Sequence, residues 1–249
     1  MAFYYGLLFD VDGTLLNFEA SEDGALRDTL AHFSLPDTEE TVAAYRSINN
    51  SLWAALEQGK LRQEKLVVQR FEKLLGAIGA KEKRINPARM NEYYLAQLAQ
   101  RADTFEGVEE ALNELAEVAT LAVVSNGVEK VQMGRLERSG LERYFDGVFI
   151  SSRVGAPKPS RKIFDAALNA LGIENRKKVL MVGDSLKADI TGGINAGVDT
   201  CWCNFHDLPL PEGAPNPKYI IRSLKELLPI VMEEEELANV GNPEKRHQV

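Results

Sequence analysis

A short apolar segment near the N-terminus leads directly into two aspartates, and this pairing constrains the fold more than any other feature. Residues 4–9 have the length and composition of a buried β-strand, and Asp10-Val11-Asp12-Gly13-Thr14 follows at once. Side chains alternate along a strand, so Asp10 and Asp12 point to the same side at its C-terminal end, where open α/β sheets bind ligands. Two such carboxylates repel each other unless a cation, a proton or a donor separates them, which favours a divalent metal and a proton-transfer role. The alternative is an acidic turn with a solvated aspartate.

Three later segments show a related pattern. Residues 121–124 are apolar and precede Ser125, and residues 179–182 are apolar and precede Gly183-Asp184, with Asp189 five residues further on. Lys158 stands between two prolines, ahead of a predicted helix. Continuous apolar runs fit parallel strands that are covered on both faces, and the C-terminal ends of parallel strands lie at one edge of a sheet. The sequence therefore predicts one crevice that contains both N-terminal aspartates, the serine, the lysine and Asp184.

Each of these later residues also has an interpretation without chemistry. Ser125 and Asn126 could cap a helix, Lys158 could be an exposed loop charge, and Asp184 could cap the helix that begins near Lys187. The order of the groups, each close to a strand-like run, favours a shared site.

The same residues resemble the four motifs of the haloacid-dehalogenase-like (HAD) phosphohydrolases. The motifs are Asp10-Val11-Asp12-Gly13-Thr14, Ser125, Lys158, and Gly183-Asp184 with Asp189. The resemblance extends over residues 7–228 and implies an α/β fold, in which a Rossmann-like core with a parallel sheet carries an inserted α-helical cap domain.

By this resemblance, Asp10 attacks phosphorus and forms an aspartyl-phosphate, which divides one difficult hydrolysis into two easier steps. The resemblance implies Mg²⁺ as the cofactor, held by the Asp10 carboxylate, the main-chain carbonyl of Asp12 and the side chain of Asp184. Asp189 would lie behind these ligands and orient them.

The resemblance also assigns the remaining steps. Lys158 would neutralise the attacking carboxylate and the phosphoryl group, while Ser125 and the backbone N–H of Asn126 would donate hydrogen bonds to phosphoryl oxygens. Asp12 would protonate the leaving alkoxide and then activate the water that cleaves the aspartyl-phosphate. An aspartate at position 12 favours a phosphatase or a phosphomutase over the ion-pumping ATPases, which carry threonine there, and over the dehalogenases, which lack the second acid.

Within the core, the local sequence resembles the bacterial pyrimidine 5′-nucleotidases of the house-cleaning type. The similarity lies in Ser125-Asn126-Gly127, Arg135-Leu136, Gly183-Asp184-Ser185 and Thr200-Cys201-Trp202 with Asn204. It implies a phosphoric monoester hydrolase whose partner is a small phosphorylated metabolite, a pyrimidine nucleoside 5′-monophosphate. The enzyme alternatives are a HAD phosphatase for a sugar phosphate or phosphoglycolate and a phosphomutase. The non-enzyme alternative is a phospho-aspartate signalling domain, which fits poorly because receiver domains are much shorter.

Composition restricts the partners and the location. A net charge of −8 and a pI of about 5.1 argue against a nucleic acid polymer or an anionic membrane as a partner. No apolar segment approaches the roughly 20 residues of a transmembrane helix, and the first apolar run lacks the basic flank of a signal peptide, so we expect a cytoplasmic protein. Cys201 and Cys203 fall on one face of a strand and are expected as core thiols, although with His206 they could form a metal site.

A helical insert is expected between the first strand and residue 104. Amphipathic patterns fill residues 22–33, 39–57, 63–78 and 87–99, and Asn86 suits the cap of the last helix. The expected domains are a core of residues 1–16 and 105–231, a helical cap of residues 17–104, and an acidic, polar C-terminal tail of residues 232–249 that is expected to be disordered. Hinges are expected near 17–19 and 103–106. Tyr45 and Trp53 could line a substrate pocket, although their spacing favours helix packing.

After the insert, helical and strand-like patterns alternate, as in βαβ units. The predicted helices are 107–118, 128–139, 161–171, 188–196 and 224–231. The predicted strands are 121–125, 148–151, 179–183, 200–203 and 219–221.

Overall fold

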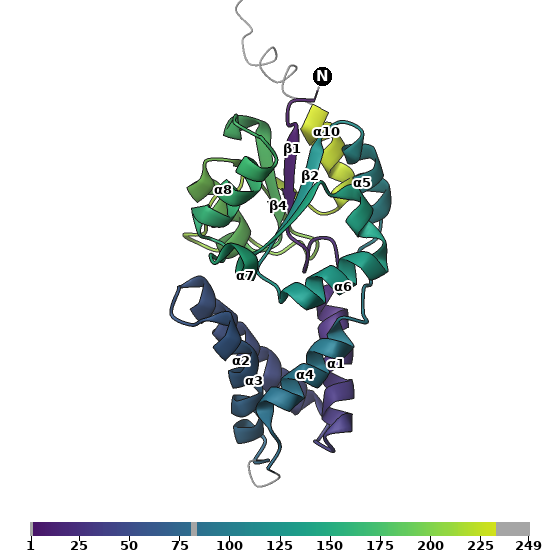
Figure 1. The fold of residues 1–249 in the computed structure, drawn as a ribbon, viewed down its shortest axis with the longest axis vertical. Helices are drawn as coiled ribbons and strands as arrows, with labels where there is room; N and C mark the ends of the chain where they lie inside the picture. Colours follow the sequence, from purple (N-terminus) through teal and green to yellow (C-terminus); the bar gives the residue numbers. More distant parts are fainter. Residues whose placement is uncertain (1, 81–83, 233–249) are drawn as a thin grey trace, which may run out of the picture.

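A computed structural model describes residues 2–80 and 84–232, and in this part of the chain six parallel strands form one sheet (Figure 1). The strands are β1 (Gly6–Phe9), β2 (Thr120–Ser125), β3 (Gly147–Ile150), β4 (Val179–Gly183), β5 (Asp199–Cys203) and β6 (Tyr219–Ile221). Their order in the sheet is β3-β2-β1-β4-β5-β6. β1 is an inner strand, and its last residue, Phe9, is aligned with Val123 of β2 and Val182 of β4. The predicted α/β fold with a Rossmann-like parallel sheet is confirmed.

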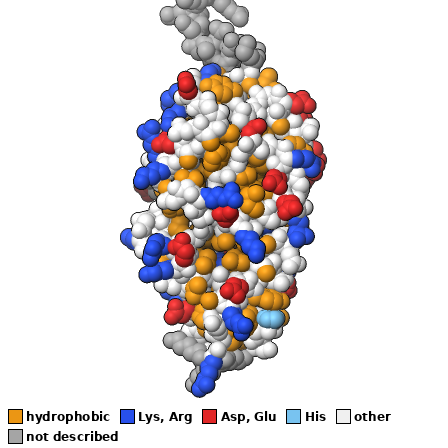
Figure 2. Space-filling view, viewed as in Figure 1, with side chains coloured by type: hydrophobic (Ala, Val, Ile, Leu, Met, Phe, Trp, Pro, Cys, Tyr) orange, Lys and Arg blue, Asp and Glu red, His pale blue; other side chains and the backbone are white. Residues whose placement is uncertain are grey.

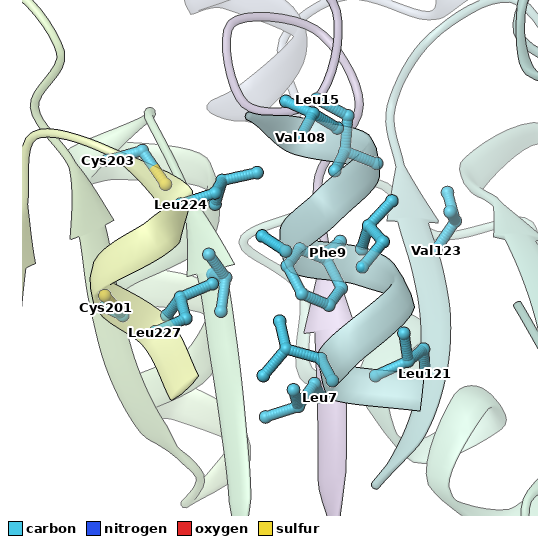
Figure 3. Packing of buried hydrophobic residues seen from close by; sticks show 14 of the residues in the cluster. Leu7, Phe9, Leu15, Val108, Leu121, Val123, Cys201, Cys203, Leu224 and Leu227 are labelled. Carbon is cyan, nitrogen blue, oxygen red and sulfur yellow. The ribbon is translucent and has the colours of Figure 1, made fainter. Parts of the chain in front are cut away.

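Helices cover both faces of the sheet, because strands that are apolar on both sides must be buried on both sides. The core helices are α5 (Val108–Ala116), α6 (Glu129–Ser139), α7 (Ser151–Val154), α8 (Arg161–Ala170), α9 (Thr191–Ala196) and α10 (Leu227–Met232). In Figure 1, α5 and α10 lie on one side of β1 and α8 lies on the other. Alternation along β1 sends Leu7 and Phe9 into the layer that contains Val108 and Leu227 (Figure 3), and Leu8 into the opposite layer.

The two cysteines are part of the first of these layers. Cys201 and Cys203 are buried free thiols on β5, and both contribute to the cluster that contains Leu224 and Leu227 (Figure 3). Burial raises the pKa of the Cys203 thiol well above its ordinary value. Within residues 2–80 and 84–232, the grouped possible metal ligands include neither cysteine nor His206. The two residues are therefore packed core thiols.

Four helices separate β1 from the rest of the core in sequence. They are α1 (Phe18–His32), α2 (Glu39–Glu57), α3 (Gln63–Ala77) and α4 (Pro87–Leu98). They lie beyond the C-terminal ends of the strands, on the far side of α6 (Figure 1). They have an apolar cluster of their own, in which Tyr45, Phe71 and Tyr94 pack with ring centroids 5.4–5.8 Å apart. Asn86 caps α4 as predicted, since its side chain accepts from the N–H of Ala88 at 2.9 Å.

The chain enters and leaves this helical insert through two adjacent extended segments. Leu16 forms a bridge with Asp12 and an antiparallel bridge with Thr104. The N–H of Asn17 donates to the carbonyl of Asp103 at 2.8 Å. The domain boundaries expected at 16/17 and 104/105 fall within these two paired segments. The first of the segments follows the Asp10–Asp12 segment closely in sequence.

Some element ends differ from the sequence-based expectation. Helix α1 begins at Phe18 rather than at residue 22, because Asn17 caps it with a side-chain oxygen 3.3 Å from the N–H of Ala20. The segment Leu186–Ile190 forms a single π-helical turn before α9, and its cap is Ser185, so the interpretation of Asp184 as a helix cap is wrong. The predicted tail 232–249 lies outside the described residues except for Met232, which ends α10.

The surface shown in Figure 2 carries basic and acidic side chains side by side over both the core and the helical insert. No broad basic face is visible from this side, in keeping with the net charge of −8. On the face shown, charges of the two signs are interspersed and form no large area of one sign.

Candidate active site

The C-terminal ends of the inner strands form the floor of a cavity. Asp10 follows β1, Ser125 is the last residue of β2, and Asp184 follows β4. Since β1 lies between β2 and β4, Asp10 is flanked by the other two groups. Asp12 and Lys158 line the same cavity. The structure thus brings together the groups that the sequence placed at separate strand ends.

Lys158 is the positive centre of this site. Its side chain is buried, and its Nζ lies 2.7 Å from Asp10 Oδ1 and 2.7 Å from Asp189 Oδ1. The contact with Asp10 is a directed hydrogen bond, whereas the contact with Asp189 has the geometry of an ion pair only. Burial lowers the pKa of Lys158, but the two carboxylates outweigh it and hold the pKa above its ordinary value. The amine therefore stays protonated and compensates the buried acids.

Asp10 is held in a low-dielectric position next to that lysine. Its residue is only 9% exposed, and burial raises the pKa of its carboxyl group while Lys158 opposes the shift. A buried carboxylate has few waters to shield it, so a second positive charge nearby would further favour its ionised form. The ionised form is the one that can act as a nucleophile.

An acidic cluster next to Asp10 offers such a place for a cation. Asp10, Asp184 and Asp189 each present a carboxylate oxygen, and these oxygens lie within 4.8 Å of one another. Asp189 is fully buried, pairs with Lys158 and accepts a hydrogen bond from the N–H of Ser185 at 2.9 Å, whereas Asp184 is exposed in the crevice. Hard oxygen donors in a compact set fit Mg²⁺. A metal bound here would supply positive charge to the phosphoryl oxygens and to the Asp10 carboxylate.

Gly13 allows the acids to approach so closely. It has a φ of 81°, in the left-handed region, and a β-carbon at this position would overlap with the carboxylate of Asp184. The glycine of the predicted motif is thus required both for the backbone turn and for the position of Asp184.

Ser125 is oriented by two donors. Its Oγ accepts hydrogen bonds from the N–H of Gly127 at 3.0 Å and from Nε2 of Gln132 at 3.1 Å. With both lone pairs engaged, the hydroxyl proton of Ser125 is left to donate elsewhere, and the residue borders the cavity. The alternative interpretation of this serine as a helix cap is wrong, because α6 begins after Val128 with no side-chain cap.

Asn126 connects two parts of the site. Its side chain donates to the carbonyl of Lys158 at 2.9 Å and accepts from the N–H of Lys158 at 2.8 Å. This pair of hydrogen bonds fixes the loop of the lysine against the end of β2. Both polar atoms of the Asn126 side chain take part in this contact, whereas its backbone N–H is not used by it.

Two residues to which sequence reasoning assigned no role hold Asp12. Gln132 and Arg135 lie one turn apart on α6, and both are buried. Nε2 of Gln132 donates to Asp12 Oδ2 at 2.6 Å, and the guanidinium of Arg135 forms a salt bridge with Oδ1 of the same carboxylate. A signal was present, because a glutamine and an arginine interrupt the apolar face of α6 between Val131 and Leu136.

The helical insert contributes the opposite wall. Phe18 of α1 and Trp53 and Glu57 of α2 line the same cavity as Asp10. Nε2 of Gln63 at the start of α3 donates to the carbonyl of Asn126 at 2.8 Å, which joins the insert directly to the site. Of the two aromatic residues considered from the sequence, Tyr45 is buried in the core of the insert, whereas Trp53 borders the crevice.

The Asp-x-Asp pair follows β1 and lies beneath a helical insert, the arrangement expected for the HAD-like hydrolases. Sequence comparison agrees with this class. A family model described as "Haloacid dehalogenase-like hydrolase" matches residues 7–203, and the chain belongs to this family. Mg²⁺ dependence and an aspartyl intermediate are typical of its members. No helix in the described ranges is both long and apolar enough to cross a membrane.

Particular relatives match over most of their length. The chain is 37% identical to pyrimidine 5′-nucleotidase YjjG of Escherichia coli (strain K12) over 221 residues, which cover 89% of this chain and 95% of that protein. It is 38% identical to pyrimidine 5′-nucleotidase PynA of Streptococcus pneumoniae over 227 residues, with coverage of 91% and 94%. A crystal structure of the HAD-hydrolase YfnB from Bacillus subtilis, bound to magnesium and revealing interdomain movement, superposes with a TM-score of 0.83 at 36% identity, with coverage of 92% and 98%. These similarities support a hydrolase of phosphomonoesters.

Proposed function

We propose that the chain is a Mg²⁺-dependent phosphatase for pyrimidine nucleoside 5′-monophosphates that works through an aspartyl-phosphate on Asp10. The observation that carries the chemistry is the placement of Lys158 2.7 Å from Asp10 and the salt-bridged position of Asp12 at the same crevice. One acid is then available as the nucleophile and another for proton transfer. The nucleotide preference rests on the two nucleotidases, to which the chain is 37% and 38% identical.

In this proposal the phosphoryl group lies between Asp10 and the end of β2. The Asp10 carboxylate attacks phosphorus, while Lys158 compensates the charge of both anions. The hydroxyl of Ser125 and the backbone N–H of Asn126 donate to phosphoryl oxygens, a role that the engaged lone pairs of Ser125 support. Asp12 delivers a proton to the leaving oxygen and later accepts one from water.

The proposed metal ligands are Asp10 and Asp184 through their carboxylates and Asp12 through its main-chain carbonyl. Asp189 would orient the cluster, because it is fully buried and is already held by Lys158 and by the N–H of Ser185.

The leaving group would point toward the helical insert. We propose a core domain of residues 1–16 and 105–231 and a cap of residues 17–104, which excludes water and recognises the nucleoside. Phe18 and Trp53 support this division, because they place aromatic surface in the same cavity as Asp10. Flat aromatic side chains are suited to contact a pyrimidine ring.

Phosphate release from a panel of substrates tests the proposal. The panel contains deoxyuridine, thymidine and uridine monophosphates, purine monophosphates, ribose 5-phosphate and glycolate phosphate, each with Mg²⁺ and with chelator. We expect the highest kcat/KM for a pyrimidine nucleotide, no turnover with chelator, and none with the Asp10→Asn variant. Equal turnover of glycolate phosphate and deoxyuridine monophosphate would exclude the nucleotidase assignment, and a change of position of the phosphate without its release would indicate a phosphomutase.

A further inference from the structure

Arg135 is the largest fully buried side chain in the described part of the molecule, and a buried guanidinium requires several partners. Besides its salt bridge with Asp12, it donates through Nε to the carbonyl of Arg101 at 2.9 Å and through Nη2 to Ser21 Oγ at 3.3 Å. Its guanidinium carbon lies 5.6 Å from the centre of the Phe18 ring. These contacts come from the N-terminal part of α1 and from the segment after α4. The orientation of the guanidinium is therefore fixed on several sides.

Gln132 is the second residue that binds the Asp12 carboxylate. Its amide nitrogen donates both to Asp12 Oδ2 at 2.6 Å and to Ser125 Oγ at 3.1 Å. The side chain needs the space above Gly127, where a β-carbon would overlap with the Gln132 amide. A single amide thus joins the Asp12 carboxylate to the hydroxyl that borders the phosphate position.

Each carboxylate oxygen of Asp12 therefore has its own buried donor. Oδ1 is held by Arg135 and Oδ2 by Gln132, which fixes the plane of the carboxylate as well as its position. Two donors on two oxygens match the ionised form of the acid. That is the form in which Asp12 accepts a proton, in the second half of the proposed reaction.

We propose that Arg135 and Gln132 are positioning residues that align the Asp12 carboxylate for hydrolysis of the aspartyl-phosphate. In that step a water oxygen bonds to phosphorus, its proton passes to Asp12, and the bond between phosphorus and the Asp10 oxygen breaks with its electron pair returning to Asp10. The inference rests on the proposed function, since it presumes the covalent intermediate on Asp10 and the base role of Asp12. Misalignment of a proton acceptor by about 1 Å is enough to cost about 100-fold in rate.

The two halves of the reaction can be separated with p-nitrophenyl phosphate. Its leaving group departs without a proton, so the first step does not need Asp12, whereas hydrolysis of the intermediate does. For Arg135→Met we expect a burst of about one nitrophenolate per enzyme, followed by turnover about 100-fold slower than wild type. The phosphorylated enzyme should then accumulate and be detected as an added phosphoryl group by intact-protein mass spectrometry.

Asp12→Asn is the benchmark for the proposed function. If it shows no burst and accumulates no phosphorylated enzyme, the role of Asp12 itself is wrong. If Asp12→Asn accumulates the intermediate but Arg135→Met loses both steps equally, the positioning role is wrong while the proposed function stands. A merely structural defect would lower the burst amplitude and the final rate together.

Three further variants guard against misfolding. Arg138→Met, an exposed arginine on the same helix, is the matched control and should keep wild-type kinetics. Arg135→Lys retains the charge without the planar fork and should fall between wild type and Arg135→Met. Gln132→Leu removes only the second donor and should accumulate the intermediate with a loss of about 10-fold in turnover. If neither Arg135→Lys nor Gln132→Leu changes the balance between the two steps, the inference is overturned.

Discussion

Lys158 donates a hydrogen bond to the carboxylate of Asp10 over 2.7 Å, although 148 positions separate the two residues in the chain. This pair is buried, and its geometry depends on the junction of β1, β2 and the loop that Asn126 fastens. Charge compensation at the candidate nucleophile is therefore a product of the whole sheet rather than of one motif.

Replacing the lysine of this pair should damage both activity and stability. Lys158→Met leaves Asp10 and Asp189 without a buried counter-charge, which costs about 3–5 kcal/mol, and we expect kcat to fall about 1000-fold. Urea unfolding in chelator measures the first effect and phosphate release the second. The exposed Lys162→Met is the control. Equal stability of Lys158→Met and wild type in chelator would contradict the expectation.

Mg²⁺ should stabilise the folded protein, because it relieves repulsion among Asp10, Asp184 and Asp189, whose oxygens lie within 4.8 Å of one another. At 100 times its dissociation constant a ligand adds about 2.7 kcal/mol to the free energy of unfolding. Thermal unfolding with Mg²⁺ and with chelator measures the shift. Asp184→Asn should abolish most of it, and a shift that persists in this variant would show that the metal binds elsewhere.

Gly13→Ala should weaken Mg²⁺ binding by at least about 10-fold, because the added β-carbon displaces the carboxylate of Asp184. Gly59→Ala is a matched control. Gly59 also has a positive φ, at 69°, but a β-carbon there meets nothing within 4 Å. The two variants share the backbone strain of roughly 1–3 kcal/mol and differ in the clash. Isothermal titration calorimetry measures the Mg²⁺ affinity of each variant. Equal affinities of Gly13→Ala and Gly59→Ala would contradict the predicted clash with Asp184.

Glu22 should make stability fall as pH rises. It is buried in the helical insert, accepts a hydrogen bond from Asn49 at 2.8 Å, and burial raises its pKa from 4.5 to about 7. Between these values the folded protein keeps a proton that the unfolded chain has released, so this stabilisation is complete below pH 4.5 and is lost as pH rises through about 7. Between pH 5 and pH 8 the free energy of unfolding of wild type should fall by up to about 3 kcal/mol more than that of Glu22→Gln. Urea unfolding across this range, with the exposed Glu72→Gln as control, checks the difference, and parallel curves for wild type and Glu22→Gln would contradict it.

Trp53 should matter for nucleotides but not for small phosphate esters. Loss of its ring from the cavity should raise KM for deoxyuridine monophosphate about 10-fold and leave ribose 5-phosphate unchanged, since base–aromatic contacts contribute about 1–3 kcal/mol. Steady-state kinetics of Trp53→Ala on both substrates measures this. Tyr93→Ala serves as the control, because it also removes an aromatic ring from the helical insert, but one that stacks on His32 and does not line the cavity. Equal losses on both substrates would indicate damage to the insert instead of lost recognition.

The strand ends of the site were predictable because the relevant signal is local. An apolar run followed by a polar group defines both the strand and its functional end, and Asp10, Ser125 and Asp184 were found in this way. Their convergence followed from the parallel sheet alone, which directs all C-terminal strand ends to one edge.

What escaped prediction depends on contacts between distant segments. Gln132 and Arg135 interact with a carboxylate about 120 positions away, and nothing in the helical pattern of α6 names that partner. The side chain of Asn126 had no expected partner, and the structure pairs it with the backbone of Lys158, 32 positions away. The start of α1 was missed because Asn17 was interpreted as a hinge and not as a cap.

The bridge between Leu16 and Thr104 has an evolutionary consequence. Since the outgoing and returning segments touch, the chain that carries the intervening helices leaves and re-enters the core at one place, as a long loop does. The free-energy cost of closing such a loop changes slowly with its length. A different helical insert can therefore replace this one between the two paired segments without changing the strand order. Related proteins with the same acids at the strand ends can in this way acquire different substrate selectivities.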